Sequence, residues 1–190
     1  MKTTIISLTA LVLTCTGAHA QSAWDGADVG ITLSANVGDQ DYCPCDNNSG
    51  IYGMTGNTGG LFAGYNYNAG SFVLGGEIAV TAGTVYEESV SSDDVYEEYD
   101  FEQFIDIKGR AGYDLGQVMA YGVLGYSIAE WSQDGVKSDS TGILFGAGVD
   151  YAITDQFIVG AELVSRSLTN DTEDFEATIN SLSLRGSYKF

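Results

Sequence analysis

Apolar and polar side chains alternate along most of this chain with a period of two residues. A period of two places successive side chains on opposite faces of a strand, whereas a helix needs apolar residues at i, i+3 and i+4. The alternation predicts eight β-strands, each at least as long as the roughly 9 to 11 residues that a tilted strand needs to cross a membrane. The predicted strands span roughly 27–37, 58–68, 71–82, 100–113, 117–130, 141–152, 156–167 and 177–190.

Each predicted strand has one apolar face and one polar or small face. In the last strand, Leu182 and Leu184 alternate with Ser183 and Arg185. The second and fifth strands are ambiguous, because Phe62 and a set of residues at 119–123 place large apolar side chains on both faces. In these two strands we assign the following residues to the outward face: Leu61, Ala63, Tyr65, Tyr67, Val118, Leu124, Tyr126 and Ile128.

The connections between the predicted strands alternate strictly between short and long. Short turns at 68–70, 114–116 and 154–155 separate longer polar segments at 39–57, 83–99, 132–140 and 168–176. The short turns contain the Asn, Asp or Gly residues that tight turns require. Outer-membrane barrels have short periplasmic turns and longer external loops, and an even number of strands then places both termini in the periplasm.

The distribution of charge distinguishes a soluble barrel from a membrane barrel. Beyond residue 20, five of the six Lys and Arg residues fall in predicted strands, all but Lys137, while acidic residues crowd the loops. A soluble surface intersperses both signs, and a Lys or Arg facing lipid near the midplane costs roughly 2 to 4 kcal/mol. We therefore predict an all-β fold, an eight-stranded antiparallel up-and-down transmembrane β-barrel. It must close, because an open sheet edge in lipid leaves backbone groups unpaired.

Charged residues on the inward faces form the main candidate site. An eight-stranded barrel is just wide enough for its own side chains to fill. We expect these residues to pair in the interior, either as a plug of salt bridges or as a gate whose pairs switch to open a narrow conductance. Inward glycines leave room for small water-filled pockets, and no continuous pore is expected. The candidate residues are Glu77, Asp106, Lys108, Arg110, Asp150, Glu162, Arg166 and Arg185.

The first 20 residues have the layout of a secretory signal peptide. Lys2 precedes an apolar run at 5–12 and small residues at 17–20, which predicts a signal peptide at 1–20 and a barrel domain at 21–190. The apolar run is too short for a spanning helix, which needs roughly 20 residues. An alternative is a lipoprotein signal with Cys15 as the acylated residue, although Thr14 is larger than the residue usually found before that cysteine.

Composition argues against several classes of function. The sequence has 7 Lys and Arg against 26 Asp and Glu, a net charge of −19, so we expect no binding to nucleic acid. Its only histidine, His19, lies in the predicted signal peptide, which excludes a Ser-His-acid triad in the mature chain. We therefore expect no enzymatic activity, no cofactor and no metal centre.

Two loop features have open interpretations. Cys43 and Cys45 flank Pro44 in the first long connection, outside the cell, where an intramolecular disulfide, free thiols or pairing with another chain are the alternatives. The acidic run at 87–98 either binds divalent cations near lipopolysaccharide or is simply a solvated loop.

Five short segments, taken in their order and spacing, resemble the OmpA-like, opacity-type family of eight-stranded outer-membrane barrels. These segments are 60–67 (GLFAGYNY), 72–77 (FVLGGE), 107–113 (IKGRAGY), 146–151 (GAGVDY) and 185–190 (RGSYKF). The resemblance implies insertion into the outer membrane and a structural or surface-interaction role, such as envelope integrity, adhesion or host contact. It also implies contact with lipid, lipopolysaccharide and an extracellular ligand or host surface. Tyr188 and Phe190 are similar to the terminal signal that such proteins present to the outer-membrane assembly machinery.

Two alternatives to that role remain. One is a narrow, porin-like diffusion channel with the same fold. The other is a secreted, lipocalin-like barrel that binds a small ligand, although Ser22 stands two residues before Trp24 where the lipocalin-type motif has glycine.

Overall fold

The computed structural model describes residues 23–42, 50–87, 100–133, 136–170 and 175–190. The predicted signal peptide at 1–20, Cys43 and Cys45 lie outside these residues. No helix among the described residues is long and apolar enough to cross a membrane. The described residues form the following strands: β1 (Gly26–Tyr42), β2 (Gly50–Asn68), β3 (Phe72–Glu87), β4 (Asp100–Asp114), β5 (Val118–Gln133), β6 (Val136–Ala152), β7 (Phe157–Asn170) and β8 (Phe175–Lys189).

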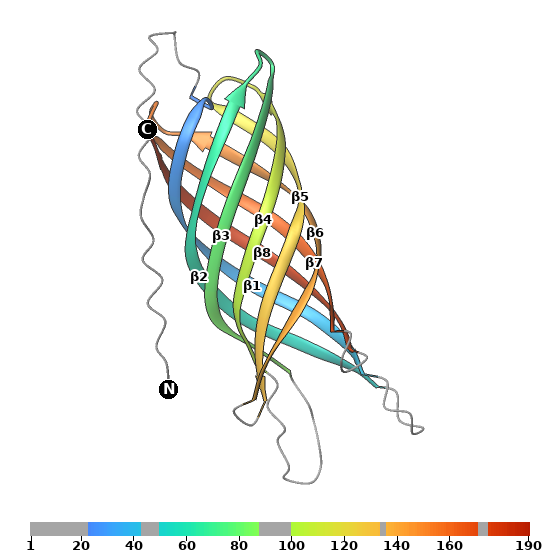
Figure 1. The fold of residues 1–190 in the computed structure, drawn as a ribbon. Coiled ribbons are helices and arrows are strands. Elements are labelled where there is room, and N and C mark those ends of the chain that lie inside the picture. The colour runs from blue at the N-terminus through green and yellow to red at the C-terminus, as the bar shows by residue number, and fades with distance from the viewer. Residues whose placement is uncertain (1–22, 43–49, 88–99, 134–135, 171–174) are drawn as a thin grey trace, which may run out of the picture.

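These strands form one closed antiparallel barrel, in which each strand pairs with its neighbours in sequence (Figure 1). The barrel closes where β1 pairs with β8, with Leu33 opposite Leu184. Beyond the end of that ladder, the Phe190 N–H donates to the Ala27 carbonyl oxygen at 2.9 Å. The predicted fold class is confirmed.

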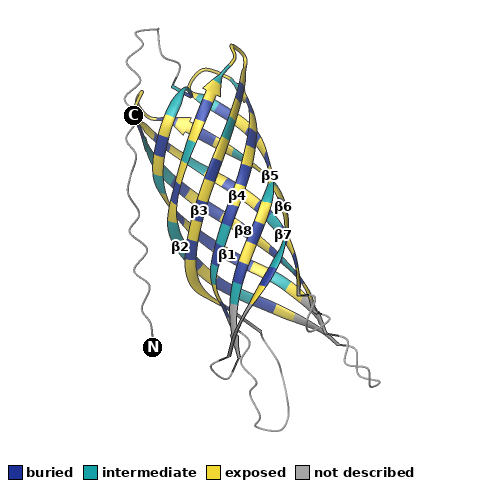
Figure 2. Ribbon diagram, viewed as in Figure 1, coloured by how far each residue is buried: buried dark blue, intermediate teal, exposed yellow. Residues whose placement is uncertain are grey.

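Buried and exposed residues alternate along every strand (Figure 2). Every residue predicted to face outward is exposed or half-buried, and every residue predicted to face inward is buried or half-buried. In the two ambiguous strands, Leu61 and Leu124 are 66% and 67% exposed, while Phe62 and Tyr121 are each 5% exposed. The assignment of faces is therefore confirmed, including the strands where bulky residues occupy both sides.

Three tight turns close one end of the barrel, which we call the turn end. Gly70 and Gly116 have φ of +91° and +89°, a conformation that favours glycine. Side chains brace these two turns, since Asn68 Oδ1 accepts from the Gly70 N–H and Asp114 Oδ1 from the Gly116 N–H, both at 2.8 Å. In the third turn Thr154 Oγ1 accepts from the Phe157 N–H at 3.0 Å. The predicted short turns are thus correct.

At the opposite end, which we call the loop end, every strand except β4 extends further than predicted. The ladder between β1 and β2 continues to Tyr42 opposite Gly50, and that between β5 and β6 to Gln133 opposite Val136. Lys137 therefore lies in β6 and not in a loop. The prediction was wrong here because the alternation marks only the lipid-facing part of a strand. Nearer the loop end outward residues such as Asp39 and Asn57 are polar, so the pattern fades while the backbone pairing continues.

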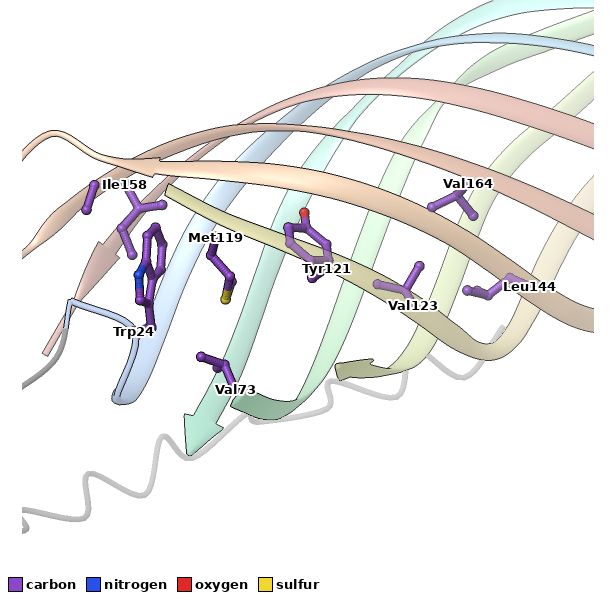
Figure 3. Packing of buried hydrophobic residues seen from close by; sticks show 9 residues of the cluster. Trp24, Val73, Met119, Tyr121, Val123, Leu144, Ile158 and Val164 are labelled. Carbon is purple, nitrogen blue, oxygen red and sulfur yellow. The ribbon is translucent and has the colours of Figure 1, made fainter. Parts of the chain in front are cut away.

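Two apolar clusters fill the interior at different heights. The turn-end cluster begins with Trp24, whose Nε1–H donates to the Gly116 carbonyl oxygen at 2.9 Å. Figure 3 shows Trp24 beside Ile158 and Met119. The turn-end cluster contains Trp24, Val73, Met119, Tyr121, Val123, Leu144, Ala152, Ile158 and Val164. The loop-end cluster contains Met54, Val85, Phe101, Phe104, Ala129, Leu168, Ala177 and Ile179.

Candidate functional site

Glu77 on β3 is the centre of a buried ion-pair network in the barrel interior. Its Oε1 lies 2.7 Å from Lys108 Nζ and 3.1 Å from Arg185 Nη1, and its Oε2 contacts Arg185 Nη2. Arg110 Nη1 lies 3.5 Å from Oε2. Lys108 and Arg110 come from β4, whose register places Lys108 opposite Glu77, whereas Arg185 reaches across from β8. Three cations therefore surround one carboxylate whose side chain is fully buried.

Two further carboxylates extend this network around the barrel wall. Glu162 on β7 accepts from Lys108 Nζ at 2.7 Å and from Arg185 Nη1 at 3.0 Å. Asp150 on β6 pairs with Arg110 Nη2 at 2.5 Å. The six charged residues thus connect β3, β4, β6, β7 and β8 through side chains alone.

A second ion pair lies closer to the loop end. Arg166 on β7 donates to both carboxylate oxygens of Asp106 on β4, from Nη2 at 2.5 Å and from Nε at 3.2 Å. The Ser127 hydroxyl donates to Asp106 Oδ1 at 2.7 Å, and Arg166 Nη1 donates to Ser181 Oγ at 2.6 Å. Ser181 in turn donates to Asn36 Oδ1 at 2.6 Å, which links this pair to β1.

The structure therefore brings all eight candidate residues into the interior. Each is at most 7% exposed, and four carboxylates face four cations, so their formal charges cancel. A buried charge without a partner is strongly destabilising, and paired geometry of this kind removes that penalty. What the arrangement can do chemically is hold the barrel wall together from within.

Aromatic rings stack on the guanidinium groups of the network, a feature that the sequence reasoning missed. The guanidinium carbon of Arg110 lies 4.0 Å from the Tyr121 ring centre, and that of Arg185 lies 3.9 Å from the Phe62 ring centre. Such contacts add roughly 0.5 to 2 kcal/mol each. The signal was present in the sequence, because these are the inward aromatic residues of the two strands with bulky side chains on both faces.

Asp28 on β1 is a further interior carboxylate that the sequence reasoning missed. It is 4% exposed and lies near the turn end, one position before the exposed Val29. The alternation of β1 already indicated this position, because Asp28 shares a face with Thr32 and Ser34. Lys189, which shares the inward face of β8 with Ser183 and Arg185, is 5% exposed and stands opposite Asp28 in the ladder between β1 and β8.

The two C-terminal candidate residues lie outside the interior network, at the turn end. Tyr188 packs edge-on against Phe157 and Phe190, with ring centres 5.3 and 5.2 Å apart. Phe190 is 66% exposed. Among the residues that the structure describes, no three His, Cys, Asp or Glu side chains are grouped so that they could hold a metal ion.

The outer wall carries a belt of exposed apolar residues, the reverse of the charged interior. Leu33, Leu124 and Leu184 on separate strands are each 66% or 67% exposed. A barrel that is apolar outside and ionic inside has the architecture of a transmembrane β-barrel. The soluble, lipocalin-like alternative does not hold, because a soluble barrel needs a polar outer wall. Further exposed members of the belt are Val29, Ile31, Leu61, Leu74, Ile78, Ile107, Ile143, Phe145, Leu163 and Leu182.

The chain belongs to the outer membrane protein beta-barrel domain family, whose model matches residues 6–190. It is 27% identical over 166 residues to the 22 kDa outer membrane protein of Rhizobium leguminosarum bv. viciae, a match that covers 85% of this chain and 71% of that protein. The protein is thus an outer-membrane barrel.

Solved structures of small outer-membrane barrels share the fold. The attachment invasion locus protein Ail of Yersinia pestis is 17% identical with a TM-score of 0.51, over 87% of this chain and 99% of Ail. Neisserial surface protein A is 18% identical with a TM-score of 0.52, over 87% of this chain and all of that one. OprG from Pseudomonas aeruginosa is 12% identical with a TM-score of 0.50, over 90% of this chain and 99% of OprG. At these identities the likeness concerns the fold alone.

Proposed function

We propose that this protein is a closed, non-enzymatic barrel that presents the loop end of its strands at the cell surface, in a structural or surface-interaction role. Envelope integrity, adhesion and host contact are the forms that this role takes. The observation that carries the proposal is the filled interior. The loop-end cluster, the ion-pair network and the turn-end cluster fill the interior together, and Tyr121 of the turn-end cluster stacks on Arg110 of the network.

A narrow diffusion channel is the competing function. Ions would need a path past Glu77, whose carboxylate is held by three cations, and past the side chains of the two apolar clusters. We therefore expect no resolvable conductance steps in planar-bilayer recordings of the wild type or of Lys108→Ala. Discrete steps in the wild type would support the channel and contradict the proposal.

The orientation in the membrane follows from the asymmetry of the two ends. We place the turn end and both termini in the periplasm after removal of the signal peptide at 1–20, because short turns mark the periplasmic side in this architecture. An epitope tag inserted after Ser22, close to the start of the predicted mature chain, leaves the terminal assembly signal intact; it should be inaccessible to antibody on intact cells and accessible once the outer membrane is permeabilised. Labelling of the tag on intact cells would show that the barrel has the opposite orientation.

The charge of the loop end constrains the partner. Asp39, Glu102 and Glu176 are exposed near the loop-end termini of their strands, and the whole chain carries a net charge of −19. Ail has been crystallised with the heparin analogue sucrose octasulfate, a polyanion that an acidic surface would repel. The charge here favours contact with neutral or cationic groups on a partner, whether that partner is an extracellular ligand, a host surface or the sugar part of lipopolysaccharide.

The surface role is testable by exchanging the segments that connect the strands at the loop end. Replacing residues 43–49 and 88–99 by short Gly-Asn turns should abolish adhesion of cells, or capture of a partner, while the amount of folded barrel in the outer membrane is unchanged. Heat-modifiable gel mobility reports the folded barrel. Adhesion that survives both exchanges would point to a purely structural role.

The absence of enzymatic activity is part of the proposal and rests on side-chain chemistry. His19, the single histidine of the sequence, precedes the predicted mature chain. Glu77, Asp150 and Glu162 are each held by buried cations, which leaves them poor general bases.

A further inference from the structure

Two buried polar atoms near the turn end make no hydrogen bond to the protein. Asp28 Oδ1 is an acceptor on β1, and Arg110 Nε is a donor on β4. Both residues are at least nine-tenths buried, at 4% and 7% exposure. Leaving a buried donor or acceptor unsatisfied costs about 1 to 3 kcal/mol, and more for charged groups.

The same two residues line one interior cavity. The cavity has a volume of about 10 Å³ and is bounded by Trp24 and Ile158 on the turn-end side. About 10 to 15 Å³ is the smallest space that holds one water molecule, which also needs two to four polar partners. Asn66 and Ser187 line the cavity as well and supply further polar groups.

The charges around the cavity select a neutral ligand. Asp28 and Asp150 contribute two carboxylates, and Arg110 and Arg185 contribute two guanidinium groups, so the formal charges of the lining cancel. A cation would be repelled by the arginines and an anion by the aspartates, and either would give up its hydration shell on entry. Water can donate to an acceptor and accept from a donor at the same time, and the cavity offers one of each.

We infer that this cavity is a binding site for a single ordered water molecule, which donates to Asp28 Oδ1 and accepts from Arg110 Nε. The water connects Asp28 to the ion-pair network through Arg110. It therefore ties β1, one side of the seam where the barrel closes on β8, to β4 across the interior. The carboxylate of Asp28, which otherwise faces Gly64 on β2, becomes part of the network.

A crystal structure of the wild-type protein at a resolution that reveals water is the first test. It should contain a solvent peak about 2.7 to 3.2 Å from both Asp28 Oδ1 and Arg110 Nε. No peak at this position would overturn the inference. A peak surrounded by several oxygens at about 2.3 to 2.6 Å would also overturn it, because that geometry belongs to a metal cation.

Variants in detergent solution provide the second test, through oxygen-17 relaxation dispersion, which counts long-lived internal waters. Asp28→Asn retains an acceptor oxygen and should retain the wild-type count, whereas Asp28→Leu should bind one water fewer. Ser34→Ala is the matched control, because Ser34 lies on the same face of β1 and its hydroxyl is bonded to Ser183 at 2.8 Å. An unchanged count in Asp28→Leu, or the same loss in Ser34→Ala, would refute the site.

Discussion

Inward and outward glycines play different parts in this barrel. A Cβ atom on the inward Gly148 would lie 2.4 Å from the Tyr121 ring, and one on Gly30 would lie 2.3 Å from the Phe62 ring. On the outward face, a Cβ on Gly109 would have its nearest neighbour at 3.6 Å. The inward glycines are therefore what allows Phe62 and Tyr121 to lie flat between a strand and a guanidinium group.

Gly148→Ala should consequently destabilise the barrel by about 1 to 3 kcal/mol, because overpacking displaces Tyr121 from Arg110. Gly109→Ala is the matched control and should change stability by no more than about 0.5 kcal/mol. Urea unfolding in lipid vesicles, followed by tryptophan fluorescence, measures both changes. Equal effects of the two substitutions would mean that the ring does not depend on the inward glycine.

The pair formed by Asp106 and Arg166 allows a clean measurement of buried-charge energetics, because it is separate from the Glu77 network. Asp106→Ala should destabilise by about 3 to 5 kcal/mol, since it leaves the Arg166 guanidinium buried without its carboxylate. Adding Arg166→Met should recover part of that loss by removing the orphaned charge. If the double variant loses as much stability as Asp106→Ala and Arg166→Met lose together, the two residues do not interact.

At the level of whole strands, the sequence predicted the lipid-facing portion well and the loop-end portion poorly. The turn ends were placed within one residue, because Asn68, Gly70, Asp114 and Gly116 carry the chemistry of tight turns. The loop ends of all strands except β4 were missed, because pairing there depends on backbone hydrogen bonds that any outward side chain permits.

The membership of the interior network was predictable from alternation, but its pairing was not. Glu77 and Arg185 are 108 residues apart and lie on strands that are not neighbours in the barrel. Which cation meets which carboxylate depends on the stagger of all the strands together, and no local pattern encodes that stagger. The cavity beside Asp28 arises from the same stagger and was therefore equally hidden.

The predicted assembly signal lies at the C-terminal end of β8. Its role in assembly can be distinguished from a role in stability by measuring both for the same substitution. Phe190 is 66% exposed and has little packing to lose, so Phe190→Ala should leave urea unfolding of the purified barrel nearly unchanged. In cells it should lower the amount of folded barrel in the outer membrane severalfold.

Phe72→Ala is the matched control for this prediction. Phe72 is 62% exposed, lies at the turn end and packs edge-on against Tyr113 with ring centres 5.4 Å apart. The Phe72→Ala variant should assemble in the outer membrane at wild-type levels. If Phe190→Ala also assembles normally, the terminal residues are not the signal.

The molecule as a whole has an apolar belt around its wall and a polar, acidic rim beyond it. The two regions should respond differently to the same substitution. Leu33→Arg, in the middle of the belt on β1, should destabilise by roughly 2 to 4 kcal/mol in a bilayer. Asp39→Arg, six positions toward the loop end on the same face, should change stability by no more than about 0.5 kcal/mol.

Unfolding titrations of both arginine variants in vesicles of one lipid composition make this comparison. A large loss of stability in Asp39→Arg would place the hydrocarbon boundary closer to the loop end than the polarity of the outward residues indicates.

The strands that continue past the belt set the height at which the connecting segments start. β1 continues beyond Val37, an exposed apolar residue on the same face as Leu33, and ends at Tyr42. At about 3.3 Å per residue and a tilt of about 40°, that stretch rises roughly 12 Å above the hydrocarbon. Mutations beyond this height leave lipid contacts and interior packing unchanged. The connecting segments can therefore evolve new binding properties while the barrel keeps its fold and stability.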